Sequence, residues 1–219
     1  RVLERLVEIT TQAQELWSTV ETDLNHVKFG RALPVKTLHQ LPDFAWGAAL
    51  ERWLGGDLPV IRCMPNTPSL VGSGASGLYA NRLVDDSQKS IATTLMESVG
   101  IVEWVDEEVL LEAVTAVAGS APAYFYLVFE ALEEAGVKLG LPAESARRLA
   151  VQTGLGAARM VQQGDADPAQ LRRNVMSPNG TTERAVTHLE EAGLRQIFLE
   201  AAEVCAARAR EMGEELGKQ

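Results

Sequence analysis

The sequence predicts an α/β segment followed by an all-α segment. Between residues 60 and 105, short apolar runs alternate with a polar stretch of helical character, which is typical of the closing part of an α/β sheet. From residue 106 to the C-terminus, apolar residues recur at helical spacing, and single glycines and prolines separate the runs. A chain of 219 residues can form one large domain or two modest ones. We therefore expect a domain boundary near residues 105–107, separating 48–105 from 106–219, and leave 1–47 unassigned.

Three strands and one helix are expected in the first segment. Residues 60–64 form an apolar run that Pro65 and Pro68 stop, and shorter runs follow at 77–80 and 101–105. Asp85 or Asp86 is expected to cap a helix that ends near Ser98. Further upstream, residues 1–22 and 48–54 have helical character. Between these two helices, residues 25–46 show no regular pattern.

The second segment predicts helices over about 106–138, 142–163, 167–174, 180–190 and 193–216. Gly119 and Pro122 should interrupt the first, because proline removes a backbone donor and clashes with the preceding turn. That helix also contains the longest uncharged run, 113–129. The run is short for a membrane span. We expect it to be buried in protein at a subunit interface.

Composition excludes some partners. The formal net charge of −10 argues against non-specific binding to nucleic acid or to an anionic membrane. The two cysteines, Cys63 and Cys205, are far apart in sequence, which is typical of buried thiols in a reducing compartment such as the cytoplasm. The three histidines form no cluster, so no metal site is expected. Because the chain begins with Arg1, we expect that its first residue is not the natural start.

Gly72, Gly74 and Gly77 have the G-x-G-x-x-G spacing of a loop that holds a dinucleotide pyrophosphate. Such a loop should directly follow a strand and open a helix. Here several residues separate the glycines from the strand at 60–64, and the residues after Gly77 suit a strand better than a helix. A turn is therefore the favoured interpretation of the three glycines.

Two other clusters combine small residues with hydroxyls. Gly119 and Ser120 lie in the interrupted helix, where a flat ligand could approach closely, although helix packing alone is the simpler explanation. The segment NVMSPNGTTERA, 174–185, predicts a turn followed by a helix start. The unpaired N–H groups and positive dipole end of such a start suit a carboxylate or a phosphate. An ordinary N-cap is the simpler explanation of this segment taken alone.

Three motifs together resemble the pyrroline-5-carboxylate reductase family. They are RCMPNTPSLVGSGASGLYA, DEEVLLEAVTAVAGSAPAYFYLVFEALEEAGVKLGLP and LRRNVMSPNGTTERAVTHLEEAGLRQIF, and the similarity runs over about residues 48–215. The resemblance implies the C-terminal part of a Rossmann-type domain that binds NADPH or NADH, followed by a helical dimerisation domain that interleaves with its partner. Dimers of this family often assemble further into decamers. The implied reaction moves a hydride from the nicotinamide to the cyclic imine and yields L-proline, the last step of proline biosynthesis.

The resemblance also implies the site residues. Thr115 and Ser120 would be catalytic, beside the nicotinamide and the substrate ring. Substrate-binding residues would be Ser177, Asn179, Gly180, Thr181 and Thr182 around the substrate carboxylate, and Asp165 at the ring nitrogen. Cofactor-binding residues would be Met64, Pro65, Asn66 and Gly119, and no metal is implied. No side chain stands out as a general acid, so positioning would supply most of the catalysis.

The sequence departs from the family pattern in places. Asn179 and Ala121 stand where family members commonly have glycine, and both are small changes. Residues 1–46 do not show the family's N-terminal glycine loop. Two alternatives therefore stay open: a non-catalytic helical dimerisation module, and a related dehydrogenase acting on β-hydroxy acids. The lack of a catalytic lysine at the expected helix position counts against the dehydrogenase, by analogy only.

Overall fold

The computed structural model describes residue 56 and residues 58–217. The expectations for residues 1–22 and 48–54 lie outside this range. The chain divides into two compact units. We call the first the sheet unit, which in the described range comprises 58–119 and 207–217, and the second the helical unit, 120–206. The domain boundary expected at 105–107 stays a prediction.

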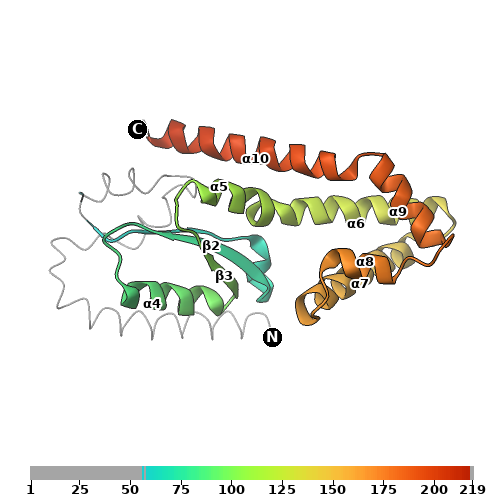
Figure 1. The fold of residues 1–219 in the computed structure, drawn as a ribbon, viewed down its shortest axis with the longest axis horizontal. Coiled ribbons are helices and arrows are strands. Elements are labelled where there is room, and N and C mark those ends of the chain that lie inside the picture. Colours follow the sequence, from blue (N-terminus) through green and yellow to red (C-terminus); the bar gives the residue numbers. More distant parts are fainter. Residues whose placement is uncertain (1–55, 57, 218–219) are drawn as a thin grey trace. The chain divides into compact units, whose positions relative to one another are not determined.

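The sheet unit contains the three expected strands, β1 (Ile61–Met64), β2 (Gly74–Ala80) and β3 (Gly100–Trp104), in the order β1-β2-β3. β1 runs antiparallel to β2, so that Met64 faces Gly77, and β2 runs parallel to β3. Helix α4 (Asp86–Glu97) connects β2 to β3, and a capping box between Asp85 and Gln88 starts it. In Figure 1, α4 and α5 lie on opposite sides of these strands.

The glycine motif is a turn in part only. Gly72 ends the short helix η1 (Thr67–Val71) in the left-handed conformation, with φ 69°. Gly74 and Gly77, in contrast, lie inside β2: the prediction of a turn is wrong there, whereas the strand expected at 77–80 is confirmed and begins earlier, at Gly74. A Cβ on Gly77 would stand 2.6 Å from Val114 Cγ1, and one on Gly74 would stand 2.1 Å from Ser69 Oγ. These two glycines are explained by close packing against the strand.

The interrupted helix begins later than expected. A turn precedes it, in which the Leu110 N–H donates to the Glu107 carbonyl. It then consists of α5 (Leu110–Val114), the π turn η2 (Thr115–Gly119) and α6 (Ala121–Lys138). The interruption predicted at Gly119 and Pro122 is confirmed, and a π turn of this kind is often found at a functional position.

The helical unit contains α6, α7 (Ala143–Gln163), α8 (Pro168–Asn174), α9 (Thr181–Glu191) and the first part of α10 (Leu194–Gly217). All the expected helices of this segment are confirmed. Small residues let α6 and α7 approach closely: a Cβ on Gly136 would stand 2.9 Å from Ala146 Cβ, and one on Gly154 would stand 2.4 Å from the Phe129 ring. The fold class predicted from the sequence, a small sheet followed by helices, is therefore correct.

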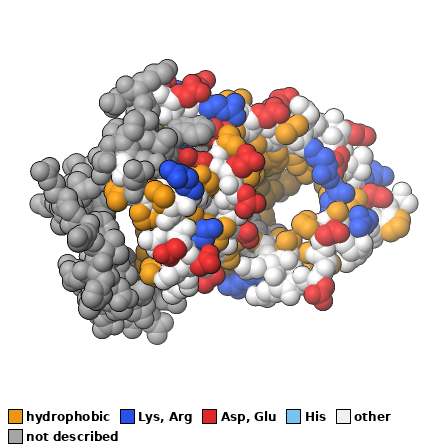
Figure 2. All heavy atoms as spheres, turned by 60° about the vertical axis from the view of Figure 1, so that its left-hand side comes forward, with side chains coloured by type: hydrophobic (Ala, Val, Ile, Leu, Met, Phe, Trp, Pro, Cys, Tyr) orange, Lys and Arg blue, Asp and Glu red, His pale blue; other side chains and the backbone are white. Residues whose placement is uncertain are grey.

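The two units bury their side chains differently. Leu78 of β2 and Leu111 of α5 are 1% and 0% exposed, and they form the core of the sheet unit with Val60 and Met64. In the helical unit the only buried residues among those described are the small Ala121 and Ala146. Figure 2 shows apolar side chains open on the surface, among charged ones. In the run 113–129, expected to be buried at a subunit interface, Thr115, Ala116 and Ala121 are buried within the single chain, and burial of the others by a partner stays a prediction.

By length and hydropathy alone, the helix Leu110–Lys138 is long and apolar enough to cross a membrane. It nevertheless carries ion-paired carboxylates, because Glu112 binds Arg210 at 2.7 Å and Glu133 binds Arg147 at 2.7 Å. A π turn also interrupts it. We interpret its apolar face as a protein interface rather than a membrane span.

Candidate functional site

The predicted site residues other than Ser120 and Asp165 fall into two groups, which we describe separately. The loop-and-turn group belongs to the sheet unit and consists of Met64–Asn66, which follow β1, together with the π turn Thr115–Gly119. The helix-start group belongs to the helical unit and consists of residues 177–182, which lead into α9. The structure brings the predicted residues together within each of these groups.

Asn66 connects the loop after β1 to two other elements. Its Nδ2 donates to the Ala118 carbonyl oxygen of the π turn at 3.1 Å. Its Oδ1 accepts from the Ala75 N–H of β2 at 2.9 Å. A carbonyl can only accept and a backbone N–H can only donate, so these partners determine which way the amide points. Asn66 therefore uses both ends of its side chain within the protein.

The Ala118 carbonyl needs this partner because of the sequence that follows it. In a regular α-helix it would accept from the N–H of residue 122. Residue 122 is proline and has no N–H to donate, while the N–H of Ala123 donates to the Ser120 carbonyl at 3.0 Å instead. The amide of Asn66 thus takes the place of a donor that the helix lacks.

Thr115 and Gly119 bring the π turn against the loop. A Cβ on Gly119 would stand 2.7 Å from Met64 Cε and 3.7 Å from Thr115 Cγ2. Thr115 is buried, and its hydroxyl donates to the Leu111 carbonyl at 2.7 Å. The hydroxyl proton is therefore used within its own helix. Pro65 is exposed.

Ser120 belongs to a second small cluster at the start of α6. The Cys205 thiol donates to Ser120 Oγ at 3.2 Å, and Tyr124 interacts with both. Burial raises the pKa of the Tyr124 hydroxyl, as does its hydrogen bond to Cys205, while its hydrogen bond to Ser120 acts in the opposite direction. Cys205 is half-buried rather than fully buried as expected, and so is Cys63. Cys205 therefore has a polar role in the helical unit that composition did not suggest.

The start of α9 has the geometry of an open helix end. The Gly180 N–H donates to the Ser177 carbonyl at 2.9 Å, and Asn179 lies in the left-handed region with φ 60°. Gly180 is the N-cap and makes no side-chain cap. A Cβ there would stand 2.4 Å from Ser177 Oγ. The predicted turn is confirmed, and the helix expected over about 180–190 begins at Thr181.

A glycine cap leaves the first N–H groups of α9 without the hydroxyl or carboxylate that usually covers them. Thr181 is exposed and Thr182 is half-buried beside them. Glu183 Oε2 accepts from the Asn179 N–H at 2.5 Å, so one carboxylate of the chain is already at this helix end. Asp165 is exposed and lies in the connection between α7 and α8.

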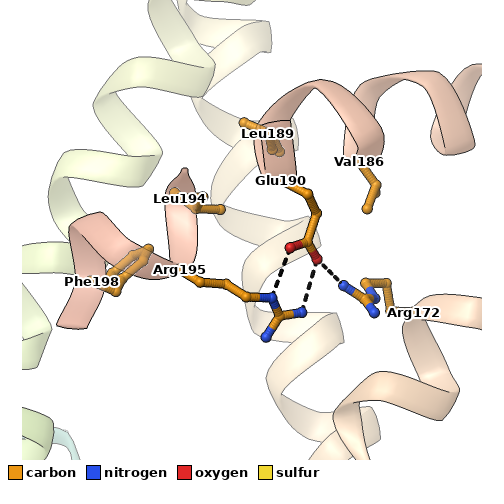
Figure 3. A pocket seen from close by; sticks show the side chains of 7 residues that line it. All are labelled: Arg172, Val186, Leu189, Glu190, Leu194, Arg195 and Phe198. Atoms are coloured by element: carbon orange, nitrogen blue, oxygen red, sulfur yellow. Dashed lines mark hydrogen bonds and ion pairs between the residues drawn. The ribbon is translucent and has the colours of Figure 1, made fainter. Parts of the chain in front are cut away.

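A shallow pocket of about 500 Å³ lies elsewhere in the helical unit. Figure 3 shows Glu190 between two arginines, with Phe198, Leu194, Leu189 and Val186 around them. Arg195 Nε lies 2.7 Å from Glu190 Oε2, and Arg172 also binds this carboxylate. Hydrogen bonds from Arg195, and then from Arg172, hold the pKa of Glu190 below its ordinary value. Within the described residues, no group of three or more His, Cys, Asp or Glu residues is placed to hold a metal ion.

Sequence reasoning missed three of these interactions. The position of Pro122, four residues after Ala118, was a signal that a carbonyl would lack its donor, but not that Asn66 would supply one. The spacing of Gly180 and Glu183 is that of an N-cap and the third helical residue, which predicts a back-reaching carboxylate. No local pattern links Cys205 to Ser120, because 85 residues separate them.

Comparison with known proteins shows which family the chain resembles. Residues 108–212 match the family model described as pyrroline-5-carboxylate reductase dimerisation. A pyrroline-5-carboxylate reductase of Pseudomonas aeruginosa is 50% identical over 171 residues, which are 78% of this chain and 63% of that protein. A second, from Corynebacterium melassecola, is 48% identical over 76% of this chain and 61% of that protein.

Solved structures agree. A pyrroline-5-carboxylate reductase from Coxiella burnetii superposes with a TM-score of 0.75 at 46% identity, covering 76% of this chain and 62% of that one. The pyrroline carboxylate reductase of Plasmodium falciparum, solved with NADP bound, gives a TM-score of 0.72 at 33% identity, covering 78% and 68%. The chain spans 61% to 63% of the length of three of the curated relatives it matches, from P. aeruginosa, C. melassecola and a Synechocystis species. In sequence, in fold and in its helical segment, this chain belongs to the pyrroline-5-carboxylate reductase family.

Proposed function

We propose that the protein reduces 1-pyrroline-5-carboxylate to L-proline with NADPH or NADH. The observation that carries the proposal is the open start of α9, which has the chemistry of a carboxylate receptor in a chain of this family. The substrate has one carboxylate and one imine. A carboxylate at this helix end would be oriented by backbone N–H groups and by nearby hydroxyls.

The helix-start group would bind the substrate carboxylate through the Thr181 and Thr182 N–H groups and hydroxyls, with Ser177 beside them. Gly180 lets the ligand approach because it has no side chain to occupy the cap. Glu183 keeps the Asn179 N–H occupied, which leaves the next N–H groups for the ligand. Asp165 remains a proposed contact of the ring nitrogen.

The loop-and-turn group would lie against the cofactor, which supplies the hydride when bound. Gly119 and the Met64 thioether pack against each other here, and together they would offer an apolar surface to a flat ring. Thr115 would shape the turn from inside, and Ser120 would present its hydroxyl at the start of α6. The P. falciparum relative is described with NADP bound. Both NADPH and NADH remain part of the proposal.

These residues act by positioning. The imine is reduced most easily as its protonated iminium, which a nearby carboxylate stabilises. The substrate's own carboxylate, held at the start of α9, contributes one such charge. The remaining contribution would come from holding the two reactants in reactive geometry.

The active form would be a homodimer. The helical unit leaves Phe125, Leu127 and Val204 between 62% and 71% exposed in the single chain. A second copy of the unit would cover them, in agreement with the family model that matches residues 108–212. Assembly into decamers and a cytoplasmic location are further parts of this proposal. No nucleic acid or membrane is needed as a partner.

A non-catalytic dimerisation module is the second candidate. It is favoured by one observation, which is that the family model matching residues 108–212 describes dimerisation. The two candidates separate on one measurement. The purified chain is mixed with NADPH or NADH and pyrroline-5-carboxylate, and absorbance at the nicotinamide band is followed. Stable dimers without cofactor oxidation would support the module.

The substrate assignment has its own test. Thr181→Ala and Thr182→Ala should each weaken L-proline binding by about 1 to 2 kcal/mol in calorimetric titration, because each removes a hydroxyl that bonds a charged group. Thr187→Ala, an exposed threonine farther along α9, is the matched control and should bind normally. Unchanged affinity in both test variants would contradict the carboxylate site at this helix end.

A further inference from the structure

Asn66 is bound at both ends by groups of the protein, which changes the role expected of it. Its Nδ2 and Oδ1 bond Ala118 and Ala75, at 3.1 Å and 2.9 Å. Each bond uses one of the two hydrogen-bonding positions at its end of the amide, and together the bonds hold the side chain between two elements. The role of Asn66 can therefore follow from what it connects.

Asn66 connects the loop after β1 to the π turn. Pro122 cannot provide the N–H that the Ala118 carbonyl would accept in a regular helix, and Asn66 Nδ2 donates to this carbonyl instead. At the same place Met64 lies so close to Gly119 that a Cβ on Gly119 would stand 2.7 Å from Met64 Cε. The donor that the proline removes from the helix is thus replaced by one from the loop after β1.

We propose that Asn66 is a positioning residue: it ties the loop after β1 to the π turn and thereby holds Met64 and Gly119 in fixed contact. This inference rests on the proposed function, which assigns both of these residues to the cofactor. It differs from that function in one respect, because Asn66 acts on the cofactor through the two elements it joins.

The variant Asn66→Asp tests the tie with minimal change of shape. Aspartate keeps the acceptor for Ala75 N–H but loses the donor to Ala118 and sets a carboxylate against the carbonyl. Asn81→Asp is the matched control. Asn81 is also an amide held by backbone groups of the sheet unit, at the other end of β1, where Nδ2 donates to the Leu58 carbonyl at 2.8 Å.

A second substitution distinguishes two roles of Asn66: holding the loop after β1 against the π turn, and only donating a hydrogen bond to the Ala118 carbonyl. In Asn66→Asp/Pro122→Ala, residue 122 regains an N–H that can bond the Ala118 carbonyl within the helix. The hydrogen bond within the helix is thereby restored, while the loop after β1 still lacks its hydrogen bond to the π turn. The double variant should therefore recover the stability of the turn and should not recover the geometry between Met64 and Gly119.

Two measurements on the full chain decide the matter. Amide hydrogen exchange over residues 115–121 should become about tenfold faster in Asn66→Asp, stay normal in Asn81→Asp, and return to normal in the double variant. The dissociation constant for NADPH, followed by nicotinamide fluorescence, should rise about tenfold in Asn66→Asp and stay raised in the double variant. Asn81→Asp should bind NADPH normally.

Three results would overturn the proposal. Recovery of NADPH affinity in the double variant would mean that Asn66 only satisfies a carbonyl. Weaker NADPH binding without faster exchange would mean that Asn66 contacts the cofactor directly. Normal exchange and normal affinity in Asn66→Asp would mean that the tie has no consequence. If the unaltered chain itself binds no NADPH, the proposed function fails, and the exchange result alone decides whether Asn66 ties the loop to the turn.

Discussion

The sheet unit and the helical unit keep their apolar side chains in different places. In the sheet unit, Leu78 and Leu111 are almost completely buried between strands and helix. In the helical unit, α6 and α7 pack through glycine and alanine, while Phe125 and Leu127 remain more than half exposed. The first unit has a core of its own. The second has the apolar residues of a core, but among the described residues of this unit several of them, such as Phe125 and Leu127, lie exposed.

Their ion pairs differ in the same way. Arg62 and Glu108 of the sheet unit pair at 3.0 Å with side chains 8% and 15% exposed. Arg195 and Glu190 of the helical unit pair at 2.7 Å with side chains 71% and 37% exposed. The buried pair is shielded from water, so removing one partner leaves the other charge buried and unpaired. In the exposed pair, water can solvate the charge that remains when one partner is removed. The comparison shows that apolar helices in a sequence need not form a complete core within one chain. A second copy of the chain can supply the other side of that core.

The largest effect is expected in the core of the sheet unit. Leu78→Ala should lower the free energy of unfolding by about 3 to 4 kcal/mol, because it leaves a cavity where the leucine was fully enclosed. Chemical denaturation monitored by circular dichroism measures it. Leu127→Ala, an equal truncation on the open face of α6, should cost far less when measured on the monomer. Equal losses in both would remove the distinction between the units.

A charge on the open face of α6 should break the dimer. Leu127→Glu places a carboxylate where the proposed partner packs, and should raise the dimer dissociation constant by about a hundredfold. Sedimentation equilibrium measures this constant. Ile91→Glu, on exposed α4 of the sheet unit, is the control and should leave the dimer intact. If the unaltered protein sediments as a well-folded monomer, the claim that a second copy covers the apolar face of the helical unit is wrong.

The buried ion pair should matter at an intermediate level. Glu108→Gln keeps the shape but leaves the Arg62 guanidinium without its charged partner, and should lower the free energy of unfolding by roughly 2 kcal/mol. Urea denaturation of both proteins provides the number. A variant as stable as the unaltered chain would show that water reaches this pair.

The smallest effect is expected at the exposed pair. Hydrogen bonds from Arg195 lower the pKa of Glu190 in the folded chain, so any stabilisation is present above the ordinary glutamate value of about 4.3 and is lost as the pH falls through the folded value. Because water screens this exposed pair, the stabilisation is small, and Glu190→Gln should melt within error of the unaltered protein even at neutral pH. Thermal melts at neutral and acid pH check this. A large loss at neutral pH would mean that the pocket of Figure 3 is covered in the assembled protein.

Much of the fold was predictable from local signals. Asp85 and Gln88 are a capping box, Pro142 and Pro168 begin helices, and Gly140 and Gly193 end them with positive φ. The helix-start group was also predictable, because the residues that form its turn and its N-cap are consecutive in the sequence. The strand start at Gly74 was not, since glycine carries no side-chain pattern and only packing against Ser69 explains it.

The sequence by itself determined the elements, the π turn's place beside Gly119 and Pro122, and the helix end at Gly180. These depend on dihedral preferences and on donors present or missing within a few residues. Only the tertiary structure decided that Asn66 supplies the donor missing at Ala118, that Cys205 reaches Ser120, and that the apolar faces of the helical unit stay open. Such pairings join residues far apart in the chain. Their energy depends on burial and geometry, which no local pattern records.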